Sequence, residues 1–127
     1  MQILAIDYGK AKTGLALGNT ETCLSEPLVV FEQGDIEKLS KQIAVIAIEH
    51  KVDKIVIGIS GGRNDIGAKN LAKSLSANYE IVYWDEKFST REAQEKSIEA
   101  GIRKGRRKKM EDAYAASVIL ENYLESL

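Results

Sequence analysis

A short, almost unbroken apolar run in the middle of the chain constrains the fold more than any other feature. Between residues 53 and 59 the sequence carries Ile55, Val56, Ile57 and Ile59. A strand with so few polar positions has no face to offer to water, and such strands occur where helices cover both faces of a sheet. We therefore expect an α/β protein with helices on both faces.

The patterns on either side of this run predict the element order βββαβαβαα. Apolar residues at spacings of three and four predict helices that alternate with the later strands. An initial meander followed by such alternation gives a mixed five-stranded sheet with right-handed crossovers. Strands are expected at residues 2–7, 13–19, 28–32, 53–59 and 80–84, and helices at 35–51, 68–75, 89–101 and 110–124.

Composition excludes several classes of protein. The chain has 127 residues, which is the size of one domain, so we expect a single domain over residues 1–127. The lone cysteine and lone histidine, Cys23 and His50, exclude a disulfide framework and a Cys/His zinc site. No stretch approaches the roughly 18 apolar residues of a membrane span. We expect a cytoplasmic protein with no membrane partner.

A basic segment at residues 103–109 stands out from an acidic chain. The remaining residues carry 12 Lys and Arg against 19 Asp and Glu. This asymmetry fits a local clamp for phosphates, and the alternative is a solvated linker between the last two helices. The residues expected to contact nucleic acid here are Arg103, Lys104, Arg106, Arg107, Lys108 and Lys109.

Acidic residues lie at two strand ends and in the first turn of a helix. Asp7 ends the first strand, Asp85 and Glu86 end the fifth, and Asp112 lies in the first turn of the last helix. Strand ends gather along one edge of such a sheet, where carboxylates would suit Mg²⁺ or Mn²⁺. Each acid also has an ordinary interpretation, as an Asx-turn, an exposed turn or a partner of the helix dipole. The pattern alone leaves both open.

Four segments in order match a known family over essentially the whole chain. They are Asp7-Tyr8-Gly9 with residues 12–16, the apolar run at 55–59, residues 85–90, and the basic segment running into residues 112–116. On these motifs the chain resembles the YqgF family, also called the RuvX or Holliday junction resolvase-like family. The polar loop at residues 60–65 differs from the common family sequence, which bears on substrate selection.

The resemblance implies an RNase H-like fold and a metal-dependent nuclease that matures the 5′ end of precursor 16S ribosomal RNA. Asp7, Glu86 and Asp112 align with the acidic residues taken as catalytic, and they would hold Mg²⁺ or Mn²⁺. Lys10 and Lys12 are near enough in sequence to neutralise the scissile phosphate, although ordinary hairpin cations are the alternative.

The sequence leaves two alternatives to a ribosomal RNA nuclease. A resolvase of four-way DNA junctions is one alternative, and it would act as a symmetric dimer. A non-catalytic nucleic-acid-binding module of ribosome assembly is another. The partners expected are therefore structured RNA or branched DNA, with a pre-ribosomal particle as a further candidate, and the chain is expected to be a monomer or a weak homodimer.

Overall fold

The computed structural model describes residues 1–9, 11–32, 34–85 and 104–127. Its strands are β1 (Gln2–Tyr8), β2 (Lys12–Asn19), β3 (Leu24–Glu32), β4 (Lys54–Ile59) and β5 (Glu80–Asp85). They form a five-stranded sheet in the order β3-β2-β1-β4-β5. β2 is antiparallel to β1 and β3, whereas β4 is parallel to β1 and β5. The predicted mixed sheet is therefore confirmed, with β1 at its centre.

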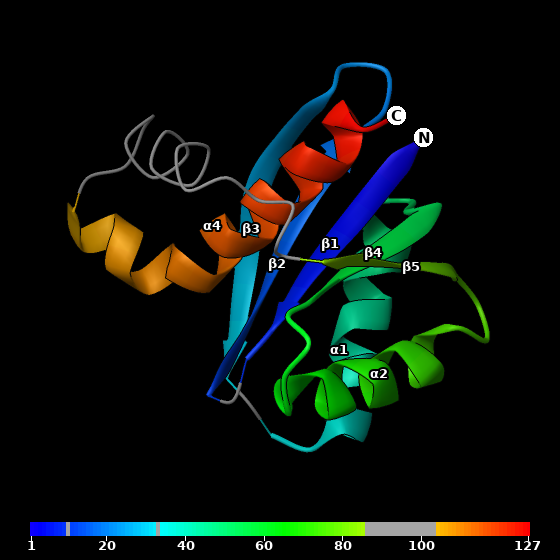
Figure 1. The fold of residues 1–127 in the computed structure, drawn as a ribbon, viewed down its shortest axis with the longest axis vertical. Coiled ribbons are helices and arrows are strands. Elements are labelled where there is room, and N and C mark those ends of the chain that lie inside the picture. The colour runs from blue at the N-terminus through cyan, green and yellow to red at the C-terminus, as the bar shows by residue number, and fades with distance from the viewer. Residues whose placement is uncertain (10, 33, 86–103) are drawn as a thin grey trace.

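Helices cover both faces of this sheet, as the sequence predicts (Figure 1). The helices α1 (Ile36–Glu49) and α2 (Asn64–Leu75) pack on one face, and α4 (Lys104–Glu125) packs on the other, mainly over β2 and β3. The expected helix at 89–101 lies outside the described residues. Within the described part of the chain, no helix is long and apolar enough to cross a bilayer.

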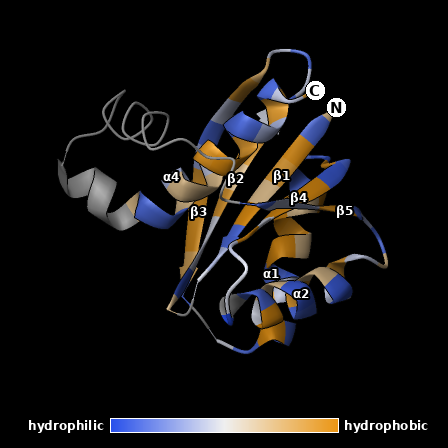
Figure 2. Cartoon of the chain, viewed as in Figure 1, coloured by the Kyte–Doolittle hydropathy of each residue, from blue (hydrophilic) through white to orange (hydrophobic). Residues whose placement is uncertain are grey.

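The two faces of the sheet bury two separate cores, and the hydrophobic residues of the strands and helices are orange in Figure 2. The face under α1 and α2 receives large aliphatic side chains from the central strands, among them Leu4, Ile6 and Ile57. The face under α4 receives Ile3 and Val56 together with the smaller Ala5 and Ala16. Burial on both faces explains why the central strands contain so few polar residues.

The third strand begins at Leu24, four residues earlier than the sequence pattern predicts. The hairpin pairs Leu24 with Asn19, so the strand already runs through Ser25 and Glu26 before it reaches Pro27. Proline has no N–H to give to a ladder, and it is tolerated here because β3 is an edge strand with an irregular register near Ala16. The proline marks a bulge and not the start of the strand.

Candidate active site

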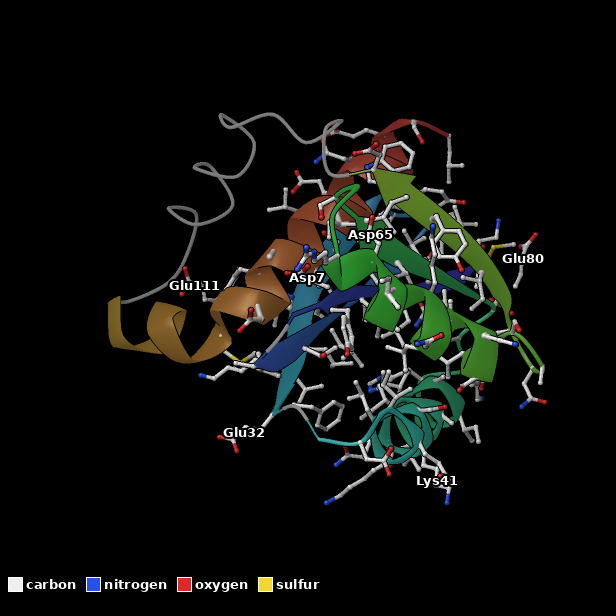
Figure 3. The ribbon with its side chains drawn as sticks, turned by 60° about the horizontal axis from the view of Figure 1, so that its bottom comes forward. Asp7, Glu32, Lys41, Asp65, Glu80 and Glu111 are labelled. Atoms are coloured by element: carbon white, nitrogen blue, oxygen red, sulfur yellow. The ribbon has the colours of Figure 1, made fainter. Side chains whose placement is uncertain are left out.

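Asp7 lies near the carboxyl end of β1, the central strand, and is half-buried. Successive side chains of a strand point to opposite faces. Leu4 and Ile6 belong to the core under α1 and α2, whereas Ile3 and Ala5 belong to the core under α4. The alternation therefore places Asp7 on the face that α4 covers, and Figure 3 shows it beside that helix.

Asp112 lies on α4 and is also half-buried. Its neighbour Ala113 is fully buried against the sheet, whereas Glu111 on its other side is exposed. Asp112 thus lies at the boundary between the packed stripe of the helix and the solvent. This position leaves its carboxylate accessible, while the adjacent packing fixes its backbone.

Gly14 of β2 lies next to both Asp7 and Asp112. It pairs directly with Asp7 in the antiparallel register of β1 and β2. A Cβ atom placed on Gly14 would lie 2.0 Å from the backbone carbonyl of Asp112. Since directly opposed residues of an antiparallel pair have Cα atoms at most about 5.5 Å apart, the carbonyl carbon of Asp112 lies within about 9 Å of the Asp7 Cα. The fold brings Asp7 and Asp112 to one place.

The third predicted carboxylate, Glu86, lies outside the described residues. Its chain neighbour Asp85 ends β5, where it pairs with Ile59. Val82 and Trp84 pack against the core under α4, so alternation places Asp85 on the opposite face from Asp7. Across the described ranges, no three His, Cys, Asp or Glu side chains form a group that could hold a metal ion. Glu86 remains a prediction.

The predicted nucleic-acid-binding cations fall into three groups. Lys12 is exposed at the start of β2, on the turn that follows Asp7. Lys10 and Arg103 lie outside the described residues. The other five basic residues do not form a linker, because α4 begins at Lys104 and not at residue 110 as predicted. The basic segment is continuous with the helix that carries Asp112, and this part of α4 extends away from the sheet (Figure 1).

The second half of α4 is held to the sheet by polar contacts as well as by its apolar stripe. The Ser25 hydroxyl of β3 donates a hydrogen bond to the Ser117 carbonyl oxygen at 3.0 Å. Tyr123 packs edge-on against Trp84, with ring centroids 5.6 Å apart. These contacts connect α4 to both outer strands of the sheet, so they fix the helix on which Asp112 lies.

Lys54 adds a further contact to this end of α4. Its Nζ donates to the Tyr123 hydroxyl at 3.4 Å and lies 3.3 Å from a Glu80 carboxylate oxygen. The hydrogen bond to Tyr123, followed by the one to Glu80, raises the pKa of Lys54 above its ordinary value. The charged form of Lys54 therefore stabilises the native arrangement of β4, β5 and α4.

The loop after β4 is organised by a residue that the sequence analysis did not single out. The Asp65 carboxylate accepts hydrogen bonds from the backbone amides of Ser60 at 3.0 Å and Gly61 at 2.6 Å. Gly61 has a φ of 84°, a conformation that glycine adopts without strain. The signal was an acid three to four residues after the glycine pair Gly61-Gly62, within reach of the backbone amides of the loop.

Comparison with known proteins assigns the chain to a family. A family model described as "RuvX: Holliday junction resolvase" matches residues 1–126. The chain belongs to the RuvX family. A relative from Desulforamulus reducens that is named as a pre-16S rRNA nuclease is 32% identical over 134 residues, which cover 99% of this chain and 98% of the relative. A relative of the same name from Paraburkholderia phymatum is 36% identical, covering 98% of this chain and 85% of its own.

Solved structures share the fold of this RuvX chain. The fowlpox virus Holliday junction resolvase superposes with a TM-score of 0.65 at 15% identity, covering 100% of both chains. RuvC of T. thermophilus, solved in complex with a Holliday junction substrate, superposes with a TM-score of 0.60 at 10% identity, covering 99% of this chain and 94% of its own. The expected RNase H-like fold is therefore confirmed.

Proposed function

We propose that this chain is a metal-dependent nuclease that hydrolyses phosphodiester bonds, and that it acts in the maturation of the 5′ end of precursor 16S ribosomal RNA. One observation carries the proposal most directly. Two half-buried carboxylates, from the central strand and from α4, lie on either side of Gly14 at one edge of the sheet. Family membership and the names of the relatives support the same activity.

The donor set fits Mg²⁺ or Mn²⁺. Asp7 and Asp112 supply carboxylate oxygens, which are the ligands that these hard cations prefer. Two carboxylates that share a site repel each other, and a cation bound between them would remove that repulsion. We propose that Glu86, the residue after the end of β5, completes the set. When bound, the metal supplies an activated water and neutralises charge on the phosphoryl oxygens.

The protein's own groups orient this chemistry. Asp7 is held by the ladders on both sides of β1, so its backbone has little freedom to move. Asp112 is held by the packing of Ala113 and by the contacts along the second half of α4. Lys12, exposed on the turn after Asp7, would place a positive charge beside the scissile phosphate. Rigid support of this kind is what a catalytic site requires.

The basic residues at the start of α4, within residues 104–109, would bind phosphates that flank the cleavage position. The backbone of α4 is helical from Lys104 and leads directly to Asp112. At a rise of about 1.5 Å per residue, Lys104 lies about 12 Å along the helix from Asp112. Each phosphate contact releases counterions, so affinity for nucleic acid is expected to fall steeply as salt increases.

A second substrate class has specific support. The fold matches two Holliday junction resolvases over nearly their whole lengths, which favours branched DNA as the alternative. A resolvase makes paired cuts and therefore acts as a symmetric dimer. The RNA assignment and the DNA assignment thus differ both in product and in oligomeric state, and one assay can separate them.

The deciding experiment is a cleavage assay in Mg²⁺ or Mn²⁺ on two end-labelled substrates. One is the 5′ precursor fragment of 16S RNA, and the other is a mobile four-way DNA junction. We expect RNA cleavage by the wild-type chain, and a loss of about 100-fold or more in Asp7→Asn and in Asp112→Asn. The matched control is Glu111→Gln, which removes an exposed carboxylate from the adjacent position of the same helix and should cleave normally.

Each remaining outcome favours a different function. Paired symmetric cuts in the junction, made by a dimer, would favour the resolvase. Binding of either substrate without cleavage would favour the non-catalytic module of ribosome assembly. Cleavage that survives in both Asp7→Asn and Asp112→Asn would contradict the assignment of these carboxylates.

A further inference from the structure

Two glycines of β2 lie beneath α4, but they meet different parts of it. A Cβ atom on Gly14 would lie 2.0 Å from the carbonyl carbon and oxygen of Asp112 and 2.4 Å from the amide nitrogen of Ala113. A Cβ atom on Gly18 would lie 2.7 Å from the Cδ2 atom of Leu120. The first obstacle is helix backbone, whereas at Gly18 the nearest atom is the end of the Leu120 side chain, followed by the Leu24 carbonyl oxygen at 3.0 Å.

The obstacle at Gly14 affects Asp112 in particular. Ordinary contact between carbon atoms requires about 3.5 Å, so a methyl group at this position would push the Asp112 backbone away by about 1.5 Å. Gly14 is the direct register partner of Asp7, so the displacement separates α4 from the strand position that carries the other carboxylate. Functional groups of a site must be held to about 0.5 Å, so this shift exceeds the tolerance.

The rest of the helix would stay where it is. Ser117 is bonded to Ser25, and Tyr123 contacts both Lys54 and Trp84. These anchors lie C-terminal to Asp112, and Leu120 is fully buried between them. A side chain at Gly14 therefore tilts the part of α4 that carries Asp112 and leaves the anchored part in place. The expected result is a folded protein with a widened site.

We propose that Gly14 is a positioning residue, whose missing side chain sets the separation between Asp112 and Asp7 that metal binding requires. This inference rests on the proposed function, because it concerns the same carboxylates. It adds a residue that touches neither metal nor substrate and that acts only through the approach of α4 to β2.

The test compares Gly14→Ala with the matched variant Gly18→Ala, since both add one methyl group beneath the same helix. Mn²⁺ binding is measured by calorimetry and by quenching of the fluorescence of Trp84, the only tryptophan of the chain. Thermal unfolding is measured in parallel. We expect both variants to fold with lowered melting temperatures, and only Gly14→Ala to bind Mn²⁺ at least 10-fold more weakly.

A rescue variant separates positioning from general damage. Asp112→Glu lengthens the side chain by one methylene group, which offsets a displacement of about 1.5 Å. We expect Mn²⁺ affinity in the double variant Gly14→Ala/Asp112→Glu to exceed that of Gly14→Ala. In the wild-type background, Asp112→Glu alone should weaken Mn²⁺ binding about 10-fold, because the unshifted helix then presents a carboxylate that is too long.

The outcomes distinguish this inference from the proposed function. If wild-type protein binds no Mn²⁺, even with nucleic acid present, the proposed function fails and the inference fails with it. If the wild type binds Mn²⁺ and Gly14→Ala binds it equally well, only the inference is overturned. If Gly14→Ala does not fold, Asp112→Glu alone decides: unchanged Mn²⁺ affinity in that single variant shows that the separation is not tuned, and weakened affinity supports the proposal.

Discussion

The two faces of the sheet differ in side-chain size where β2 contributes to them. The central strands place Leu4, Ile6 and Ile57 under α1 and α2, and these large side chains lie between the helices and the sheet. Under α4, β2 presents Gly14 and Gly18, and at Gly14 the helix approaches the strand backbone to backbone. Large side chains maximise buried apolar area, whereas small ones allow a functional group on a helix to come close to one on a strand.

The difference suggests a division of roles between the faces. Burial of aliphatic side chains stabilises the fold in proportion to area and tolerates small displacements. A carboxylate pair tolerates far less displacement, so its supporting face needs rigid backbone contact. We therefore expect substitutions under α1 and α2 to change stability without changing the site. The comparison of Gly14→Ala with Gly18→Ala probes the other face.

The largest effect on stability is expected for Leu71→Ala. Leu71 of α2 is fully buried in the core under α1 and α2. Its truncation leaves a cavity and should lower the free energy of unfolding by about 2–5 kcal/mol, measured by urea denaturation. Cleavage activity and Mn²⁺ affinity per folded molecule should be unchanged. A large loss of Mn²⁺ affinity in protein that is still folded would contradict the division between the faces.

A smaller effect of the opposite sign is expected for Thr13→Val. Thr13 is fully buried, and among the described residues its hydroxyl has no hydrogen-bond partner. Alternation along β2 places it on the same face as Leu15, under α1 and α2. Removing an unsatisfied buried hydroxyl at nearly constant shape should raise the free energy of unfolding by about 1 kcal/mol. A decrease in the urea midpoint would mean that the hydroxyl is satisfied in solution.

The smallest effect concerns Lys54 and the pH dependence of stability. Its pKa is raised in the folded protein by Tyr123 and Glu80. Its contribution to stability is therefore fully present below the ordinary lysine pKa of about 10.5, and it is lost as pH rises through the higher folded value. The difference in melting temperature between wild type and Lys54→Met should be constant to about pH 10 and then shrink. A difference that stays constant to pH 12 would contradict this assignment.

Much of this architecture is predictable from the sequence, because it follows from hydrophobic periodicity. The apolar run around Val56 required cover on both faces, and Asp35 marked the start of α1. Asp7 and Asp112 were predicted to converge, and Gly14 explains how they do. The close approach of the α4 backbone to Gly14 was not predictable, because a glycine in a strand also fits a bulge or a weakened strand position. Only the register with Asp7 and the path of α4 reveal its role.

The start of α4 was predicted wrongly for a physical reason. The six cations of residues 103–109 were predicted to form a phosphate clamp, with a solvated linker as the alternative, and the helix was predicted to begin after them at residue 110. Lysine and arginine are nevertheless good helix formers, and Gly105 costs a helix only about 1 kcal/mol. The packed stripe that begins at Ala113 gives the helix a fixed end from which it extends. The charge of a segment therefore predicts its exposure to solvent better than it predicts the conformation of its backbone.

Because α4 is continuous from Lys104 to Glu125, it fixes both the distance and the rotation between any two of its residues. Each residue between the basic segment and Asp112 contributes about 1.5 Å of length and about 100° of rotation. Lengthening this interval by one residue would change the reach of the cations only slightly, but it would turn them by more than a quarter of a circle relative to the carboxylate. The spacing along the sequence therefore sets both the distance and the angle between the basic segment and Asp112.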